Sequence, residues 1–445
     1  MRTHAGSCRL AAALAVISCG LMVDTVRAQV PPAPGARPAA ATVRWSLGDV
    51  IATALANHPL IGQADAGARA TAARRGQAAS VELPQVAATA GASWAEAKSA
   101  STGSQESASA TTVRGTVNQL LTDFGRTGAS LARASDLADA SEQSARSSRV
   151  EVLFAAEVAY FNVLRAVNLQ GVRRETLRQR EALQRQAQAF FDAGVKARID
   201  VVRAEANLFQ ARADAAGVEH EVRTARLILL NSMGIDGPAE FELAGAPEVV
   251  EAAGTIEDWQ READEKHPDL MALGLQLAAA RNGLLAARRG DYPSLTAAGS
   301  LGWAGTDELP NDRAWSVGAQ LNVPIFNGHL TRQQISEAEA LVAAAEFALN
   351  NRRRQIHLVI EQAEQAMQDA AEQVIASEKA REAFAENLRL ATGRYDAGAA
   401  DIIEMIDAQV QMTTADTNLV RAHFDQGTAL ALLYRALGRL PQSVR

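Results

Sequence analysis

The chain carries one long pattern twice. The segment FDAG at 191–194 recurs as YDAG at 395–398, which is 204 positions later, and the match continues from there without a gap. Nearer the start of each copy, His58-Pro59 recurs 209 positions later as His267-Pro268. A repeat of this length predicts that the two halves fold alike. The two copies span residues 46–238 and 256–442, joined by a connection at 239–255.

Each copy contains two runs in which apolar and polar residues alternate, which is the period of a β-strand. In the first run Val86, Ala88 and Ala90 share one face, and Gln85 and Thr89 lie on the other. Each run has about the length of a transmembrane strand, with one face for lipid and one for a lumen. The predicted strands are 84–97, 110–122, 293–304 and 313–323.

Three tryptophans lie toward the loop end of these strands. Trp94 and Trp303 each follow a proline by ten residues, and Trp315 opens its strand beside the same loop. This common height predicts a girdle at a membrane interface. The alternative is a soluble, half-buried hairpin with the tryptophans in its core.

Very long helical stretches follow the strands. No proline occurs from Phe124 to Ala193, and at about 1.5 Å per residue this stretch would be about 105 Å long. In the last stretch alanines recur at every seventh position from Ala408 to Ala436. This heptad spacing predicts close helix packing with left-handed coiling. The predicted long helices are 124–193, 200–234, 328–396 and 401–438.

The N-terminus reads as an export signal. Basic residues precede an apolar stretch, and a small-residue cleavage site ends at Ala28. We predict a signal peptide at 1–28 and a flexible linker at 29–45. In the alternative reading the residues before Cys19 form a lipobox, which would make Cys19 a lipidated N-terminus.

Composition argues against several classes of function. The net charge of -7 provides no basic field for nucleic acid. Both cysteines, Cys8 and Cys19, lie in the predicted leader, so cleavage would leave no cysteine nucleophile and no cysteine-bound metal. The sequence has no phosphate-binding loop, nucleophile elbow or pair of histidines at zinc spacing. We therefore expect no catalytic site, no cofactor and no metal.

Four strands are too few to close a barrel in one chain, because about eight is the smallest usual number in the outer membrane. Open edges in lipid leave backbone groups unpaired, each at a cost of several kcal/mol. Copies of the chain must therefore pool their strands. Two copies would give a minimal barrel that its own side chains nearly fill, and three would give twelve strands around a water-filled lumen.

This order of elements resembles the TolC-like outer-membrane efflux proteins, or outer membrane factors, along almost the whole mature chain. The matching motifs are Asn57-His58-Pro59, Lys266-His267-Pro268, the segments QLLTDFG at 119–125 and PIFNG at 324–328, and the stretch that runs from RYDAG at 394–398 to DAQ at 407–409. The resemblance implies an α+β, mostly α membrane protein. It would be a homotrimer whose twelve-stranded outer-membrane barrel continues into a periplasmic α-helical coiled-coil barrel, with 239–255 in an equatorial belt.

The resemblance also implies a function. The chain would be the passive outer-membrane channel of a tripartite efflux or type I secretion system. Its partners would be a periplasmic adaptor protein and an inner-membrane pump of RND or ABC type. A periplasmic coiled-coil structural protein without a barrel is the alternative, and the sequence leaves the substrate open among drugs, metals and secreted proteins.

Acidic residues follow the break in each long helical stretch. Asp200 and Glu404 each lie six residues after the glycine of the break, and Asp407 lies nine residues after it. Threefold symmetry would arrange these carboxylates in rings, which attract cations. The alternative is that Asp200 and Glu404 only stabilise the first turns of helices.

The resemblance assigns roles at this break. It implies an entrance constricted by Glu404 and Asp407 and latched closed with the help of Asp200 and Tyr395. The chain departs from the family at Ala400, where a latch arginine would be expected. Lys196 occupies the equivalent position of the first copy, so we expect an altered latch.

Overall fold

The computed structural model describes residues 44–98, 105–245, 254–306 and 312–440. The predicted signal peptide, most of the predicted linker and the Cys19 alternative lie outside these residues. The middle of the connection at 239–255 also lies outside them.

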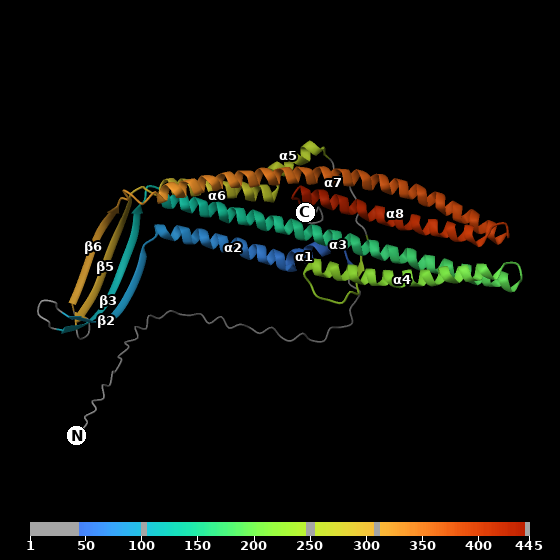
Figure 1. The fold of residues 1–445 in the computed structure, drawn as a ribbon, viewed down its shortest axis with the longest axis horizontal. Helices are drawn as coiled ribbons and strands as arrows, with labels where there is room; N and C mark the ends of the chain where they lie inside the picture. Colours follow the sequence, from blue (N-terminus) through green and yellow to red (C-terminus); the bar gives the residue numbers. More distant parts are fainter. Residues whose placement is uncertain (1–43, 99–104, 246–253, 307–311, 441–445) are drawn as a thin grey trace, which may run out of the picture. The chain divides into compact units, whose positions relative to one another are not determined.

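The proline-free stretches form two helices of equal length, α3 (Arg126–Asp192) and α7 (Leu330–Asp396), each of 67 residues. Each is followed by a return helix, α4 (Arg198–Met233) or α8 (Ile402–Ala436). Gly194 and Gly398 end the long helices with φ angles of 72° and 71°, which glycine adopts without strain. The chain therefore reverses, and α4 packs along α3 as α8 packs along α7 (Figure 1).

A pair of shorter helices opens each copy. They are α1 (Leu47–Asn57) with α2 (Pro59–Ala79), and α5 (Ile256–Lys266) with α6 (Pro268–Arg288). His58 and His267 end the first helix of each pair and cap the second, because their Nδ1 atoms accept from the amides of Leu60 (3.2 Å) and Asp269 (3.1 Å). These histidines thus serve as helix caps.

Helix α6 is long and apolar. An 18-residue window of α6 has a mean hydropathy of 1.3, so by length and composition the helix could cross a membrane. However, α6 packs along α3 and α7. This packing covers part of its apolar surface, because 22% of the window is buried in the single chain.

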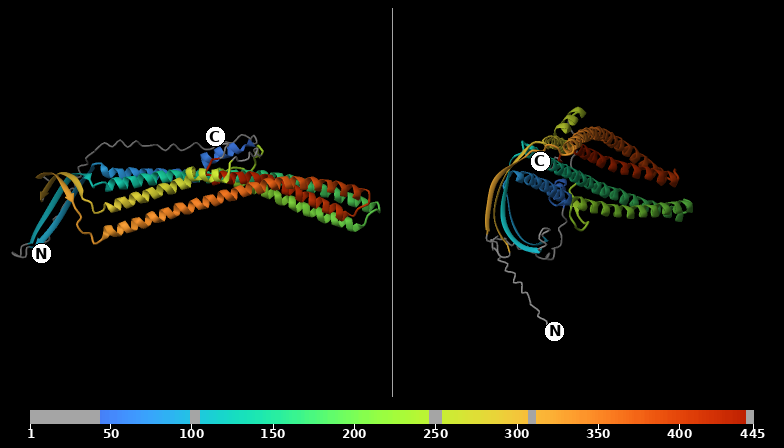
Figure 2. Two further views of the ribbon diagram at one scale, coloured as in Figure 1. Left: turned by 90° about the horizontal axis from the view of Figure 1, so that it is seen from above. Right: turned by 60° about the vertical axis from the view of Figure 1, so that its left-hand side comes forward.

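The four predicted strands form one antiparallel sheet in the order β2-β3-β5-β6. Their bounds are β2 Gln85–Lys98, β3 Gln105–Thr122, β5 Ser294–Thr306 and β6 Asp312–Asn322. Strand β3 begins five residues before the predicted start at 110. Figure 2 shows that the sheet is curved. Within the described residues, β2 and β6 each pair on one side only, so the sheet has two open edges.

The apolar side chains of this sheet are exposed in the single chain. Trp94 is 68% exposed and Trp315 is 72% exposed. A soluble half-buried hairpin would have placed these tryptophans in a core, and the single chain does not do so. The exposed apolar face requires another environment, which is either lipid or another protein.

A compact core lies where α1, α3 and α4 meet. Its large, fully buried members include Ile51, Leu153, Tyr160, Leu229 and Met233. Beside it a two-residue strand β1 (Arg44–Trp45) pairs in parallel with β4 (Glu242–Leu243). The Tyr160 hydroxyl donates to the Gly245 carbonyl over 2.6 Å. These contacts fasten the connection between the two copies to the first copy.

One carboxyl group is buried near this core. Glu157 of α3 is only 8% exposed. Burial raises the pKa of Glu157 to about 7, because a charged carboxylate is poorly solvated there. This group therefore changes its charge near neutral pH.

Candidate functional site

The predicted gate residues lie where the long helices reverse. Each of the four helices α3, α4, α7 and α8 contributes to one buried apolar cluster at these reversals, which we call the turn cluster. Its members are Leu183, Ala187, Ala204, Tyr395, Ile402 and Met405. The turn cluster joins the α3–α4 pair of the first copy to the α7–α8 pair of the second. Separating the two pairs would expose it to water.

Tyr395 lies at the centre of the turn cluster and is completely buried. Its ring contacts that of Phe190 with 5.8 Å between centroids. Its hydroxyl is buried without a hydrogen-bond partner among the described residues. Burial raises the pKa of Tyr395, and the negative charges of Asp200, Asp401 and Asp396 raise it further. The tyrosine is therefore held as a neutral, mainly apolar contact.

Asp200 lies in the first turn of α4 and is 6% exposed. The negative charge of Asp200 acts on Tyr395 of the other copy, and the latch role of these two residues stays a prediction. Glu404, the equivalent acid of the second copy, is half-buried in the first turn of α8. The duplicated positions consequently have different environments.

Lys196 connects the two reversals directly. Its Nζ donates to the carbonyl oxygen of Ala400 over 3.1 Å and lies 5.4 Å from the centroid of the Tyr395 ring. The cation therefore contacts the position where the family resemblance led us to expect an arginine. It reaches that position from the opposite copy, and it combines a charged hydrogen bond with a cation–π contact.

Two further polar links join the copies near the reversals, and the sequence analysis missed both. Gln186 donates to Asp396 over 2.6 Å. Arg180 donates to Gln409 over 2.7 Å, and burial lowers the pKa of Arg180. A comparison of the two copies could have found the arginine, because the residue 204 positions later is Phe384. A charged residue where the other copy has an apolar one indicates that the charge has a polar partner in the fold.

The remaining predicted acids lie on the surface of α8. Glu404 forms an ion pair with Arg394 at 2.8 Å, while Asp407 is exposed. The pair offsets part of the negative charge that the sequence suggested for the entrance. Asp407 is therefore the stronger candidate for attracting a cation.

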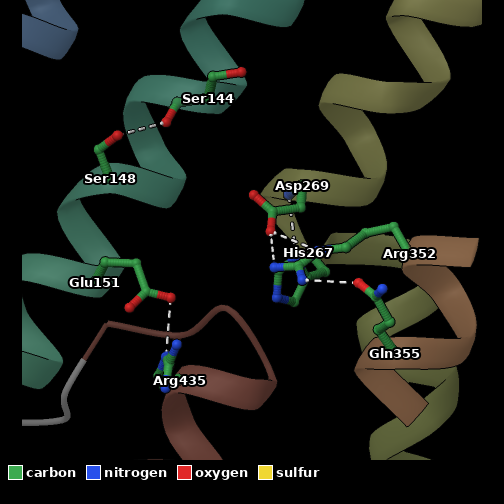
Figure 3. Close-up of polar contacts among 8 residues, drawn as sticks. All are labelled: Ser144, Ser148, Glu151, His267, Asp269, Arg352, Gln355 and Arg435. Carbon is green, nitrogen blue, oxygen red and sulfur yellow. Dashed lines mark hydrogen bonds and ion pairs between the residues drawn. The ribbon is translucent and has the colours of Figure 1, made fainter. Parts of the chain in front are cut away.

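A second polar cluster lies far along the helices from the reversals, where α3, α6, α7 and α8 approach one another (Figure 3). Asp269 accepts from Nε of Arg352 over 3.0 Å, and Arg435 donates to Glu151 over 2.9 Å. Burial opposes the charge on Asp269, but hydrogen bonds from Ser147 and Arg352 outweigh it and lower the pKa of this carboxyl. These ion pairs hold neighbouring helices in register, and we assign them no transport role.

The girdle tryptophans occupy different rows of the strand register. Trp303 lies opposite Val113, Trp94 opposite Ser109, and Trp315 opposite Leu301. Strands in barrels are tilted, so a row of the register does not run parallel to a membrane surface. The girdle accordingly stays a prediction.

Comparison with known proteins matches this architecture. The family described as outer membrane efflux protein matches residues 50–235 and 259–439. OprJ of Pseudomonas aeruginosa is 28% identical over 319 residues, which are 67% of this chain and 64% of OprJ. Nodulation protein T of Rhizobium leguminosarum is 26% identical over 56% of this chain and 54% of its own length. The match thus spans between about half and two thirds of these two relatives.

A solved structure described as a membrane protein from Pseudomonas aeruginosa has the same fold. Its TM-score is 0.80 at 24% identity, with 89% of this chain and 92% of that chain covered. The family match covers most of both copies. The protein is located in the outer membrane and extends into the periplasm, and the chain belongs to the outer membrane efflux protein family.

Proposed function

We propose that this chain is one protomer of a homotrimeric outer-membrane duct. Three copies would pool their strands into a twelve-stranded barrel, and their helices would continue as a periplasmic coiled-coil tunnel. The duct would be passive, without a catalytic site, and would serve a tripartite efflux or type I secretion system. A periplasmic adaptor and an inner-membrane pump of RND or ABC type would dock to it, and the pump would select the substrate.

The curved four-stranded sheet with two open edges carries this proposal. Unpaired backbone groups at a sheet edge invite pairing with another strand, and in lipid they must be paired. Three copies supply enough strands for a water-filled lumen, whereas two would leave little space inside. The exposed tryptophans Trp94, Trp303 and Trp315 would then lie near the membrane interfaces.

The reversals of the long helices would form the periplasmic gate. In the closed state the turn cluster holds the two helix pairs together, with Lys196 and the buried Asp200 and Tyr395 across the joint. Opening would separate α7–α8 from α3–α4. It would break the bond from Lys196 to Ala400 and hydrate Tyr395. Glu404 and Asp407 would contribute charge to the constriction.

Reconstitution in planar bilayers tests the duct. The detergent-extracted protein should form ion-conducting pores, and these should open further when Lys196 is replaced. Protein found in the soluble periplasm, with no conductance after reconstitution, would favour the alternative of a coiled-coil structural protein. The exposed apolar sheet argues against that alternative, because a coiled-coil protein without a barrel would leave this apolar face in water.

A further inference from the structure

We infer that Arg180 and Gln409 together bind a small monovalent anion such as chloride. Arg180 of α3 is 5% exposed, and Gln409 of α8 is 4% exposed. The arginine donates to the side-chain oxygen of Gln409 over 2.7 Å, and this bond joins the first copy to the second. An anion held here would be a ligand of the helices themselves, which the proposed duct does not include.

The pair lies one layer from the turn cluster, inside the section built by α3, α4, α7 and α8. Arg180 precedes Leu183 of that cluster by three residues, and Gln409 follows Met405 by four. Residues at these spacings share a face of a helix. Both side chains therefore face the joint between the two helix pairs.

The guanidinium of Arg180 is a buried charge with a neutral partner. In the part of the chain that the structure describes, Gln409 is its hydrogen-bond partner, and no ion pair joins it to an acid. By contrast, Arg352 and Arg439 have side chains that are 40% and 37% exposed, and each pairs with a carboxylate. Buried charges in proteins are ordinarily paired, because water no longer solvates them.

Arg180 cannot escape this cost by losing its proton. Burial lowers the pKa of Arg180, which means that the charged form is less stable here than in water. The ordinary pKa of a guanidinium lies so far above neutral that the group stays charged. A negative charge beside it would therefore stabilise the folded chain.

The site offers hydrogen-bond donors from both helices. A guanidinium has five N–H groups, and the bond to Gln409 uses one of them. The Gln409 amide accepts through its oxygen, so its NH2 group can donate to an anion. One turn away, the hydroxyl oxygens of Thr176 and Thr413 lie 3.2 Å apart, so polar groups continue along this seam. A single negative charge would balance Arg180, which favours chloride over a divalent anion.

Gln409→Glu tests whether an anion neutralises Arg180. The variant places a carboxylate of nearly the same shape against the guanidinium, where it would pair with the arginine and displace the anion. The unfolding midpoint should be measured in potassium chloride and in potassium gluconate at equal ionic strength, because gluconate is too large for a nearly buried site. The natural chain should gain about 2–4 °C more from chloride than the variant does, because only the natural chain binds the ion.

Three further variants show where the chloride acts. Gln411→Glu adds the same charge at an exposed position of α8, and Arg185→Met removes an exposed arginine from α3. Both should keep the natural chain's dependence on chloride. Arg180→Met should lose it, and Gln409→Glu gives the same information without removing the buried charge.

An equal dependence on chloride in the natural chain and in Gln409→Glu would overturn the inference. It would mean that water or an acid of another protomer stabilises Arg180, and that chloride acts as an adventitious ion only. That result would leave the duct standing, because conductance after reconstitution tests the duct separately.

Anomalous diffraction would locate the ion directly, with bromide as the probe in place of chloride. In crystals of the assembled protein grown with sodium bromide, each protomer should show a bromide peak in contact with Arg180 and Gln409. Crystals of Gln409→Glu should lack this peak. A peak that persists in the variant, or bromide bound only elsewhere on the protein, would contradict the site.

Discussion

Lys196 contacts Ala400, the position at which the chain departs from the pattern that the family resemblance implied. Its ammonium group bonds to a backbone carbonyl at Ala400 and not to a side chain. Alanine at this position therefore does not weaken the contact. The cation reaches Ala400 from the other copy of the duplicated turn, and it also contacts the ring of Tyr395. Such a contact depends on how the two turns meet in space.

We predict that Lys196→Ala loosens the closed state. Loss of the charged hydrogen bond at this half-buried site should shift the equilibrium by about 1–2 kcal/mol, which is a factor of about 5–30 in the open population. Single-channel recording should show more frequent opening. Arg198→Ala removes a nearby exposed charge that makes no bond to Ala400 and is the control. An unchanged opening frequency for Lys196→Ala would refute the latch.

Tyr395→Phe should have the opposite consequence. The hydroxyl is buried without a partner in the part of the chain that the structure describes, and such a group costs about 1–3 kcal/mol. Its removal keeps the ring contact with Phe190 and should leave the closed state unchanged or stabilise it. The same recordings would measure fewer openings or an equal number. More frequent opening would mean that the hydroxyl makes a stabilising bond in the trimer.

Charge selectivity should depend more on Asp407 than on Glu404. Because Arg394 pairs with Glu404, Asp407→Asn should reduce the preference for cations more than Glu404→Gln does. Arg394→Gln should increase that preference by freeing Glu404. Reversal potentials across a salt gradient measure all three variants. If neither acid variant changes selectivity, the acids act only in their helices, and the narrowest point lies elsewhere.

At the scale of the elements, the sequence predicted most of what local chemistry determines. The long helices α3 and α7 begin and end within three residues of the predicted bounds, because no proline interrupts them and a glycine with positive φ follows each. Alternation predicted the strands, although β3 begins earlier than its alternating part. The site was harder to predict. Asp200 and Glu404 occupy equivalent positions, and only tertiary packing decides that one is buried and the other forms an ion pair.

The stability of the fold should depend on pH through Glu157 of α3. Its pKa is raised from 4.5 to about 7 in the folded state, so the folded chain holds a proton that the unfolded chain has lost. Stability is therefore greatest below pH 4.5 as far as this group is concerned, and it falls as the pH rises toward 7. The difference is about 3 kcal/mol.

Glu157→Gln should remove this component. Thermal unfolding in detergent at pH 5 and pH 8 would then differ less for the variant than for the natural chain. Glu142→Gln, an exposed position on the same helix, should leave the difference as it is. An equal pH dependence in the natural chain and in Glu157→Gln would show that the carboxyl is solvated in the assembly.

At the scale of the whole molecule, the duplication explains why one chain is incomplete. Each copy supplies one hairpin and two long helices, and the second hairpin pairs with the first on one side only. The unpaired edges β2 and β6 and the exposed tryptophans then have a common cause. They are the surfaces that neighbouring protomers and lipid would cover.

The number of copies in the assembly tests this account most directly. The protein should be extracted from outer membranes in mild detergent, and its mass should be measured by native mass spectrometry. We expect a complex of three protomers, because three copies of a four-stranded sheet would close a barrel with a lumen. A stable monomer, or a complex of two protomers, would contradict the proposal that twelve pooled strands form the duct.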